Sequence, residues 1–362
     1  VLDRAGAELR QVTLLHGTRE TTAALPAAPH PRFAWGRAVG RETLDHLLLE
    51  RAGLEGVDVH QPMTVRSIGG RVGAWTCELR APDSDRTTTL AAPVFVDAHG
   101  SWETLPAECA PPAPPHGPRD LLAFKASFTG GCHPEGRISV LALDGGYGGV
   151  VVGADGVTTL AGCVRRGRLE ALRRDAPGLR AGDVVGAWLA RECDGVARAL
   201  RGATRTGAWL ASGPLRPGIR VGLPDGILRI GNAGAEAHPI LGEGMSMALQ
   251  SGALLAAELG AAPSPADAVA LASSAAFRRR HAALWRRTFA SRLRFAAAFA
   301  HAAMRPSGAR AMMGLATRWP ALLTHGARHG AKTRPLAVRL PPGPATLSSA
   351  ASIRSASRST TS

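Results

Sequence analysis

The sequence predicts an α+β protein in which an interrupted α/β domain is combined with an antiparallel β domain and C-terminal helices. The first observation is a helical pattern from Arg41 that is followed by strand-like segments, because this order is typical of an α/β unit. The second is a run of short strands with glycine-rich turns at 119–164, which is typical of an antiparallel sheet. The third is helical periodicity after Asp267.

Composition supports a globular protein with two domains. The chain has 362 residues, of which 45% are hydrophobic and 20% are charged. Its longest apolar run, 295–303, is too short to span a bilayer, and we expect neither a transmembrane segment nor an export signal. Five cysteines at wide spacings contain no C-x-x-C pair, so neither a disulfide framework nor a zinc site is indicated. We therefore expect a cytoplasmic protein.

The N-terminal third is predicted as a hairpin, a helix and several strands. The hairpin comprises 9–15 and 21–25, and the helix begins at Arg41 and ends near 53–56. Its apolar positions follow helical spacing and are Leu44, Leu47, Leu48 and Ala52. The strands predicted after this helix begin at 57 and lie at 72–79 and 94–98.

The remaining elements follow a proline-rich joint at 111–118. Strands are predicted at 121–128, 138–143, 149–152 and 158–164, then a helix at 182–200 and a buried strand at 227–231. A helix begins at Met245, and arginine-rich helices fill about 267–303 and continue to about 328. The last thirty residues are rich in Pro, Ser and Thr, which predicts disorder.

The net charge of +15 is concentrated at the C-terminus. Residues 268–362 contain sixteen Arg and Lys and no acidic residue, whereas residues 1–267 sum to −1. This distribution allows a second interpretation, a nucleic-acid or anionic-surface binder. Its basic residues would be Arg278, Arg279, Arg280, Arg286, Arg287, Arg292 and Arg294, and its interleaved aromatic residues would be Phe277, Trp285, Phe289 and Phe295. The helical spacing of the aromatic residues instead favours a packed helix with solvated arginines.

The segment 229–250 carries the most chemical information. A strand leads to Gly231 and Asn232, Pro239 fixes a turn, and Gly242 and Gly244 open a helix. Free N–H groups and the helix dipole favour a negative or electron-rich group at such a helix start, and glycine lets a ligand approach the backbone. The alternative is an ordinary strand, turn and helix in which the glycines serve tight packing.

Ser246 offers a rival interpretation as the nucleophile of a serine hydrolase. The segment 244–248 differs by one small residue from the G-x-S-x-G elbow. That elbow requires the serine on a sharp turn directly after a strand, whereas the predicted strand ends fifteen positions earlier. Position therefore argues against this function.

Three segments together resemble a known family. They are the helix start Arg41-Glu-Thr-Leu-Asp45, the strand end Val96-Asp-Ala-His-Gly-Ser101, and the segment from Gly231 to Leu255. In this order and spacing they resemble FAD-dependent oxidoreductases and monooxygenases of the para-hydroxybenzoate hydroxylase and geranylgeranyl reductase type. The resemblance covers about residues 1–330 and implies an FAD/NAD(P)-binding Rossmann-like domain. It also implies FAD as the cofactor and a small organic molecule as the substrate.

The resemblance implies a role for seven residues. Arg41 would approach the FAD pyrophosphate, and Gly231 and Asn232 would meet the ribityl chain. The isoalloxazine would be bordered by Pro239, Gly242, Gly244 and Met245. Negative charge that develops on the ring during reduction would be stabilised by the helix N-terminus. No role is expected for His99, and His238 is expected to be an ordinary loop histidine rather than a catalytic base.

The resemblance also implies a division into domains. The FAD-binding domain would comprise 32–110 and 222–262, and the substrate domain 1–31 and 119–221. C-terminal helices would occupy 263–334, with a disordered tail at 335–362.

The chain departs from the family pattern before Arg41. No G-x-G-x-x-G turn matches the unit that holds the ADP part of FAD, and Asn232 stands where the family has Asp. We therefore expect an N-terminally truncated domain with weak FAD binding, and inactivity of this fragment stays an alternative.

The implied reaction begins with reduction by NADH or NADPH. It continues either as hydroxylation with O2 or as hydride transfer to a double bond, and the sequence does not choose between the two. The absence of a Trp-x-Trp-x-Ile-Pro motif argues against a halogenase. A decayed fragment without function is a third interpretation.

Overall fold

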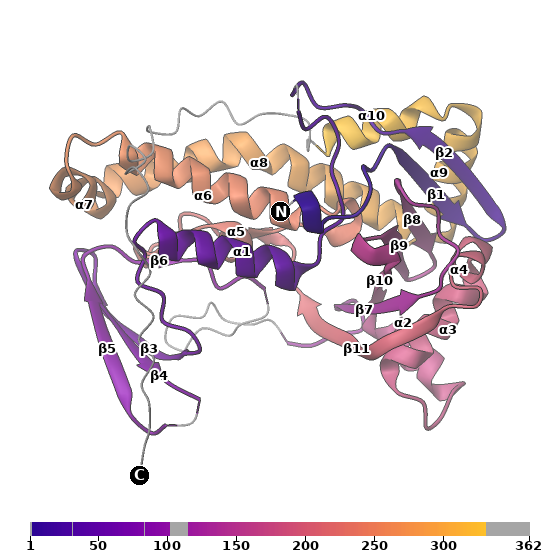
Figure 1. Ribbon diagram of the computed structural model, residues 1–362, viewed down its shortest axis with the longest axis horizontal. Helices are drawn as coiled ribbons and strands as arrows, with labels where there is room; N and C mark the ends of the chain where they lie inside the picture. Colours follow the sequence, from indigo (N-terminus) through magenta and orange to yellow (C-terminus); the bar gives the residue numbers. More distant parts are fainter. Residues whose placement is uncertain (1, 31, 83, 102–114, 331–362) are drawn as a thin grey trace, which may run out of the picture.

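The computed structural model describes residues 2–30, 32–82, 84–101 and 115–330 (Figure 1). The predicted tail at 335–362 and the first half of the predicted proline-rich joint, 111–114, lie outside these residues. The described chain contains one large sheet with helices on both faces, and a second region around α1 (Arg41–Leu54) and α6 (Gly244–Gly260).

The large sheet joins the N-terminal hairpin to the strands that follow residue 119. Neighbouring strands are antiparallel except β8 and β1, which are parallel. The order is β11 (Thr204–Leu215), β7 (Leu121–Thr129), β10 (Thr158–Arg165), β9 (Gly146–Val152), β8 (Arg137–Leu143), β1 (Gln11–His16) and β2 (Arg19–Ala24). The predicted hairpin and four predicted strands are therefore confirmed in one mixed sheet.

Alternation along the strands gives this sheet two apolar faces. Leu14 and Leu15 are adjacent in β1 but belong to different core clusters, because successive side chains point to opposite sides. The Leu15 side is covered by α2 (Arg166–Arg174), α3 (Ala181–Glu192) and α4 (Asp194–Ala199). The Leu14 side is covered by α8 (Ala275–Ala303), α9 (Pro306–Arg318) and α10 (Ala321–His329) (Figure 1).

The second region contains three small sheets. β3 (Thr64–Arg71), β4 (Ala74–Arg80) and β5 (Thr87–Ala92) form an antiparallel sheet. β6 (Val96–Asp97) is parallel to β13 (Leu228–Arg229), and β12 (Gly218–Ile219) is antiparallel to β14 (Ala235–Glu236). The remaining elements are α5 (Gly231–Gly234), α7 (Pro265–Ser273), η1 (Leu2–Arg4), η2 (Ala154–Gly156) and η3 (Pro239–Leu241).

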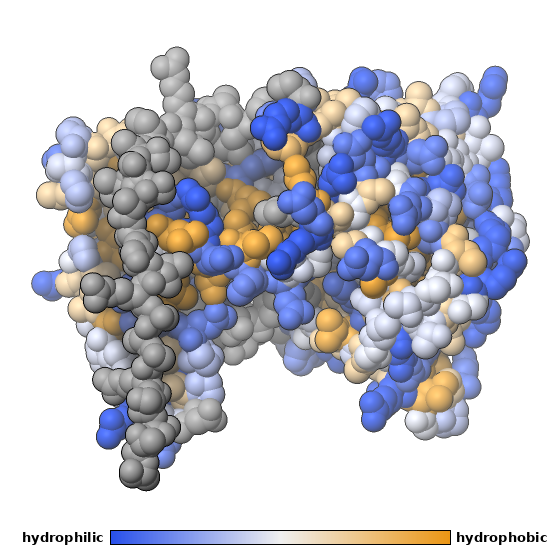
Figure 2. Space-filling model, viewed as in Figure 1, coloured by the Kyte–Doolittle hydropathy of each residue, from blue (hydrophilic) through white to orange (hydrophobic). Residues whose placement is uncertain are grey.

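The predicted helix at Arg41 is confirmed, but its apolar face is not buried by the described residues. No residue of α1 is buried, and Leu48, Leu49 and Leu54 are exposed. Leu249 on α6 is also exposed, and hydrophobic side chains gather around α1 and α6 in Figure 2. This region therefore leaves apolar surface uncovered within the described part of the chain.

Several sequence predictions need correction. Residues 57–59 form no strand, although valine alternates with aspartate there, because no neighbouring strand pairs with them. The helix predicted at 182–200 is interrupted at Cys193, which is extended (φ −144°) and forms a parallel bridge with Gly17. The strands β3, β5 and β11 and the helix α2 were not predicted.

Candidate functional site

The candidate site lies where two parallel strands end in front of α6. β6 and β13 pair Val96 with Leu228 and Asp97 with Arg229, so their carboxyl ends lie at one edge. Beyond this edge, Asn232 Nδ2 donates to Ser101 Oγ at 2.9 Å. A Cβ at Gly244 would lie 3.9 Å from Asn232 Oδ1. The structure therefore brings together the second and third of the segments that carry the family resemblance.

Gly231 holds the strand end against α6. Its φ of +57° lies in the left-handed region that favours glycine, and a Cβ there would lie 3.3 Å from Ala248 Cβ. The Gly231 N–H donates to Ser251 Oγ at 3.2 Å, and Trp285 Nε1 donates to the same oxygen at 3.1 Å. This buried hydroxyl links the start of α5 (Gly231–Gly234) to α6 and α8. Gly231 thus has a packing role besides the predicted contact with a ligand.

The segment before α6 leaves the start of this helix open. Pro239 is exposed and begins η3, and Gly242 ends η3 with a left-handed φ of +63°. α6 follows, and its buried N-cap residue Glu243 makes no side-chain cap hydrogen bond. Among the described residues, apart from its chain neighbours and the nearby backbone of α6, the atom nearest to a Cβ built on Gly244 is Asn232 Oδ1 at 3.9 Å. Free donors and open space at one helix start can accept an electron-rich group.

An apolar cavity of about 430 Å³ lies beside this segment. Of the predicted flavin-binding residues, Gly242 and Met245 line it, and Ser246 lines it too. The rest of its wall includes Val12, Leu14, Trp35, Ile138, Val140, Ile240, Phe295, Phe299, Leu322 and Leu323. The cavity therefore extends from the start of α6 to the large sheet, under α8 and α10.

Arg41 lies on α1, and the polar contacts that the structure gives it stay within that helix. It begins α1, is exposed, and donates to Asp45 at 2.8 Å across one turn. Among the described residues it has no other hydrogen bond or ion pair. Its role beside a pyrophosphate stays a prediction.

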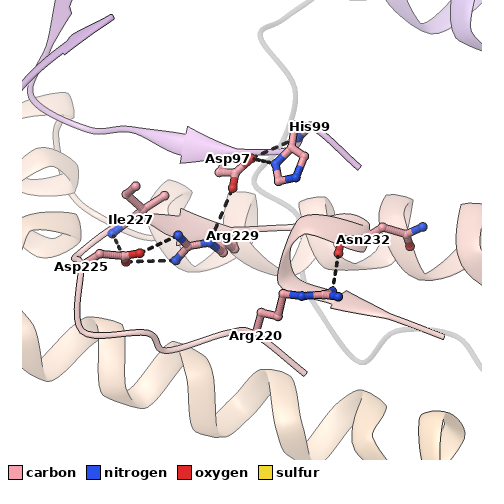
Figure 3. A network of polar contacts seen from close by, with 7 residues as sticks. All are labelled: Asp97, His99, Arg220, Asp225, Ile227, Arg229 and Asn232. Atoms are coloured by element: carbon pink, nitrogen blue, oxygen red, sulfur yellow. Dashed lines mark hydrogen bonds and ion pairs between the residues drawn. The ribbon is translucent and has the colours of Figure 1, made fainter. Parts of the chain in front are cut away.

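A buried charge network lies directly behind the site (Figure 3). Arg229 is 4% exposed, its Nη1 donates to Asp225 Oδ1 at 3.0 Å, and its Nε lies 3.5 Å from Asp97 Oδ2. Asp97 is 3% exposed and accepts from the His99 backbone at 3.1 Å, and its Oδ1 lies 2.5 Å from His99 Nδ1. The network fixes the ends of β6 and β13 relative to each other.

The Asp97 carboxyl stays charged within this network. Burial alone would raise its pKa, but hydrogen bonds from His99 and the charge of Arg229 outweigh burial and lower the pKa below its usual value. Sequence reasoning missed the network. Two features of the sequence signal it: Arg229 is a charged residue inside the apolar run 227–230, and Asp97 is an acidic residue inside a predicted strand. Charged residues in such buried segments are typically paired.

The rival interpretations find little support in the structure. Ser246 lies in the first turn of α6, and its Oγ accepts from Gln250 Nε2 at 3.0 Å. None of the histidines or carboxylates in the described ranges is hydrogen-bonded to it. A serine hydrolase needs such a base beside the nucleophile.

The arginine-rich helix α8 uses its aromatic side chains for packing. Phe277, Trp285 and Phe289 are at most 1% exposed, so they are unavailable to stack on bases. Arg286 donates to the Val221 carbonyl at 2.7 Å, and Arg292 donates to Gln250 Oε1 at 2.7 Å. These observations favour a structural role for the helix.

The described residues contain neither a metal-binding cluster nor a helix that could cross a membrane. No group of three or more His, Cys, Asp and Glu side chains there could hold a metal ion. None of the described helices combines the length and the hydropathy that a bilayer span requires. The four cysteines that the structure describes are free thiols.

Comparison with known proteins identifies the fold. No family model matches the chain, and no curated protein matches it in sequence. A myxobacterial FAD-dependent halogenase, CndH, is 18% identical with a TM-score of 0.66, and the match covers 92% of this chain and 78% of that one. The flavin-dependent halogenase CmlS is 15% identical with a TM-score of 0.61, over 88% of this chain. The chain spans 59% of the length of CmlS.

A third solved structure extends the likeness beyond halogenases. A geranylgeranyl bacteriochlorophyll reductase-like protein from Thermoplasma acidophilum is 11% identical with a TM-score of 0.57. The match covers 89% of this chain and 83% of that one. At these identities the likeness concerns the fold. The predicted fold class is therefore confirmed: the chain has the mixed α/β fold of FAD-binding Rossmann-like proteins, with an antiparallel sheet and C-terminal helices.

Proposed function

We propose that the chain is a FAD-dependent oxidoreductase that acts on a small organic substrate. The observation that carries this proposal is the meeting of Ser101, Asn232 and Gly244 at the uncapped start of α6. When bound, FAD supplies the redox chemistry. The free N–H groups of α6 stabilise negative charge at this point, and they do so without reorganisation because the helix fixes them.

The residues present fit the ring and ribityl parts of FAD. Asn232 offers an amide to a ribityl hydroxyl beside the Gly231 backbone, and Gly244 leaves space for close approach. Pro239, Gly242 and Met245 would border the ring, and Arg41 would reach the pyrophosphate. Among the described residues β6 pairs with β13 alone, and no glycine-rich turn for the ADP part accompanies it. We therefore expect weak FAD binding by this chain.

The proposed reaction is hydroxylation by a monooxygenase or reduction of a double bond, with NADH or NADPH as the reductant. The apolar cavity beside Gly242 and Met245 supports a small organic substrate. The likeness to halogenases is one of fold, and the missing Trp-x-Trp-x-Ile-Pro motif keeps halogenation outside this proposal. Free thiols are in keeping with a cytoplasmic location.

A pair of matched glycine variants on α6 tests the proposal. Gly244→Ala adds a Cβ that meets nothing closer than 3.9 Å, and Gly252→Ala adds one that lies 3.8 Å from Ile230. Both variants should fold, since neither contact is strained. In a fluorescence titration with FAD, we expect Gly244→Ala to weaken binding at least about tenfold. Gly252→Ala should bind like the wild type.

Two results would count against the proposal. Absence of any FAD binding by the wild-type chain would reject the flavin assignment. Equal affinity of the two variants would reject the start of α6 as the binding point and return the glycines to a packing role.

A further inference from the structure

A second cavity, of about 640 Å³, lies at the ends of β7, β10 and β11. Four arginines line it, namely Arg119, Arg165, Arg216 and Arg305. Apolar side chains, among them Leu215 and Met304, form another part of its wall. A cavity with both kinds of wall suits a molecule that has a charged end and an apolar body.

The charge of this cavity is strongly positive. Asp120 is its one carboxylate, and it is already engaged by Arg216 at 3.5 Å and by Arg166 at 3.4 Å. Arg119, Arg165 and Arg305 have no side-chain hydrogen bond or ion pair with any residue in the described ranges. Three guanidinium groups therefore remain available to an anion, and each has the planar set of donors that matches a carboxylate.

His238 adds a buried donor to the same cavity. It lines the cavity, is 8% exposed, and has its Nδ1 3.3 Å from the Tyr147 hydroxyl. Burial lowers the pKa of His238 to about 4, so its ring is neutral at pH 7. Burial raises the pKa of Tyr147, so the phenol keeps its proton.

These two protonation states leave one proton on the His238 ring, and the tautomer decides which nitrogen carries it. In the tautomer on which the proposal rests, the Tyr147 phenol donates to His238 Nδ1. The proton of the ring then resides on Nε2, which has no hydrogen-bond partner among the described residues. His238 can thus donate one hydrogen bond to a ligand in the cavity.

We propose that this cavity binds a small organic acid, with its carboxylate held by Arg165, Arg305 and the His238 Nε2–H and its apolar body against Leu215 and Met304. His238 directly precedes Pro239, which begins the segment that we assign to the flavin ring. If that assignment holds, the organic acid is a second ligand of the flavin enzyme, distinct from the substrate of the apolar cavity beside Gly242, and in this respect the inference rests on the proposed function.

Calorimetric titration of the full chain without FAD tests the inference. The probes are naphthoate, methyl naphthoate, which keeps the apolar body and lacks the charge, and inorganic phosphate, which has charge alone. We expect naphthoate to bind at least about tenfold more tightly than either of the other two. Equal binding of the ester would overturn the role of the arginines, and binding of phosphate alone would overturn the organic acid.

Arginine variants locate the binding. Arg165→Gln/Arg305→Gln should weaken naphthoate binding at least about tenfold. The control Arg294→Gln/Arg310→Gln removes the same charge from exposed positions of α8 and α9 that line neither cavity, and it should bind like the wild type. Equal loss in both double variants would assign the binding to net charge and overturn the site.

The outcomes separate this inference from the proposed function. Binding of FAD without binding of naphthoate rejects the anion site and leaves the flavin assignment intact. If the chain binds naphthoate but not FAD, the anion site is supported, and the proposal that it belongs to a flavin enzyme is rejected.

Discussion

Two arginines of this chain pair with aspartate in very different surroundings. The Arg229 side chain is 3% exposed between Asp97 and Asp225, whereas the Arg41 side chain is 55% exposed beside Asp45. Removal of one partner of a buried pair leaves an uncompensated charge, which is strongly destabilising. An exposed pair is screened by water and contributes little. Loss of the Arg–Asp ion pair should therefore destabilise the fold far more at Arg229 than at Arg41.

We expect Arg229→Met to lower the free energy of unfolding by about 3–5 kcal/mol, because Asp97 stays buried without its cation. Arg41→Ala should lower it by less than about 1 kcal/mol. Urea denaturation of the two variants beside the wild type measures both changes. A loss at Arg41 as large as that at Arg229 would contradict the assignment of the buried network.

Arg41→Ala also tests a ligand contact. If Arg41 approaches the FAD pyrophosphate, this variant should bind FAD more weakly than the wild type while its free energy of unfolding falls by less than about 1 kcal/mol. Fluorescence titration and urea denaturation of the same preparation give the two values. Unchanged FAD affinity would leave Arg41 as a solvated residue at a helix start.

His238 should make stability depend on pH. Its pKa of about 4 in the folded chain is below the ordinary value of 6.5, because burial and the neighbouring His301 disfavour the charged ring. The unfolded chain therefore binds a proton more readily, and stability falls as the pH decreases from 6.5 towards 4. Urea midpoints across this range should fall more steeply for the wild type than for His238→Gln. Parallel curves would show that His238 is not buried as a neutral ring.

At the scale of the element, α8 explains why an arginine-rich segment is part of the core. Phe277, Trp285 and Phe289 repeat on one side of the helix, and Trp285 and Phe289 lie 4.9 Å apart between ring centroids. Residues between them, such as Arg287, face solvent. The helix is thus amphipathic: its exposed arginines lie away from the core, whereas Arg292 is buried and bonds to Gln250.

Phe289→Ala should therefore cost about 3–5 kcal/mol of unfolding free energy, because it leaves a cavity at a fully buried position. Arg287→Ala should change the unfolding free energy by less than about 0.5 kcal/mol. Thermal or urea unfolding checks both. The opposite order of effects would mean that this helix does not pack by its aromatic face.

Elements whose hydrophobic residues repeat at the spacing of a helix or a strand were predictable from the sequence. Elements that depend on pairing with residues far away in the sequence were not. The period of α6, α8 and the strands β7 to β10 directly reflects a buried side, and these predictions are confirmed. β11 was missed because nearly all of its side chains are exposed or half-buried and it contains Gly207, Gly213 and Pro214. Cys193 interrupts a helical pattern because it pairs with Gly17, far away in sequence.

The same distinction applies to the candidate site. The glycine-rich segment that follows Gly231 was predictable, since glycine, proline and a helix start are local signals. The network of Asp97 and Arg229 and the cavity at His238 were not, because each depends on residues that only the tertiary fold brings together. The roles of the seven predicted flavin-binding residues stay predictions.

At the scale of the whole molecule, charge is separated along the chain. The C-terminal quarter has +16 and the rest −1, so any polyanion would meet this quarter first. The structure uses part of this charge internally, since Arg278 donates to the Ala272 and Ser273 carbonyls and Arg286 to the Val221 carbonyl. With Phe277, Trp285 and Phe289 buried, α8 offers DNA or RNA mainly the charge of its arginines. Such binding carries no sequence information.

We therefore expect weak, sequence-independent binding of nucleic acid that decreases steeply with salt. If six or more phosphates are engaged, affinity should fall about a thousandfold or more between about 50 and 200 mM salt, because phosphate contacts act through counterion release. Fluorescence anisotropy with unrelated duplexes of equal length measures both the salt dependence and the sequence dependence of the affinity. Arg278→Ala/Arg279→Ala/Arg280→Ala should weaken all duplexes alike. Tight, sequence-selective binding that persists at physiological salt and is lost in this variant would make nucleic-acid recognition the primary function in place of flavin chemistry.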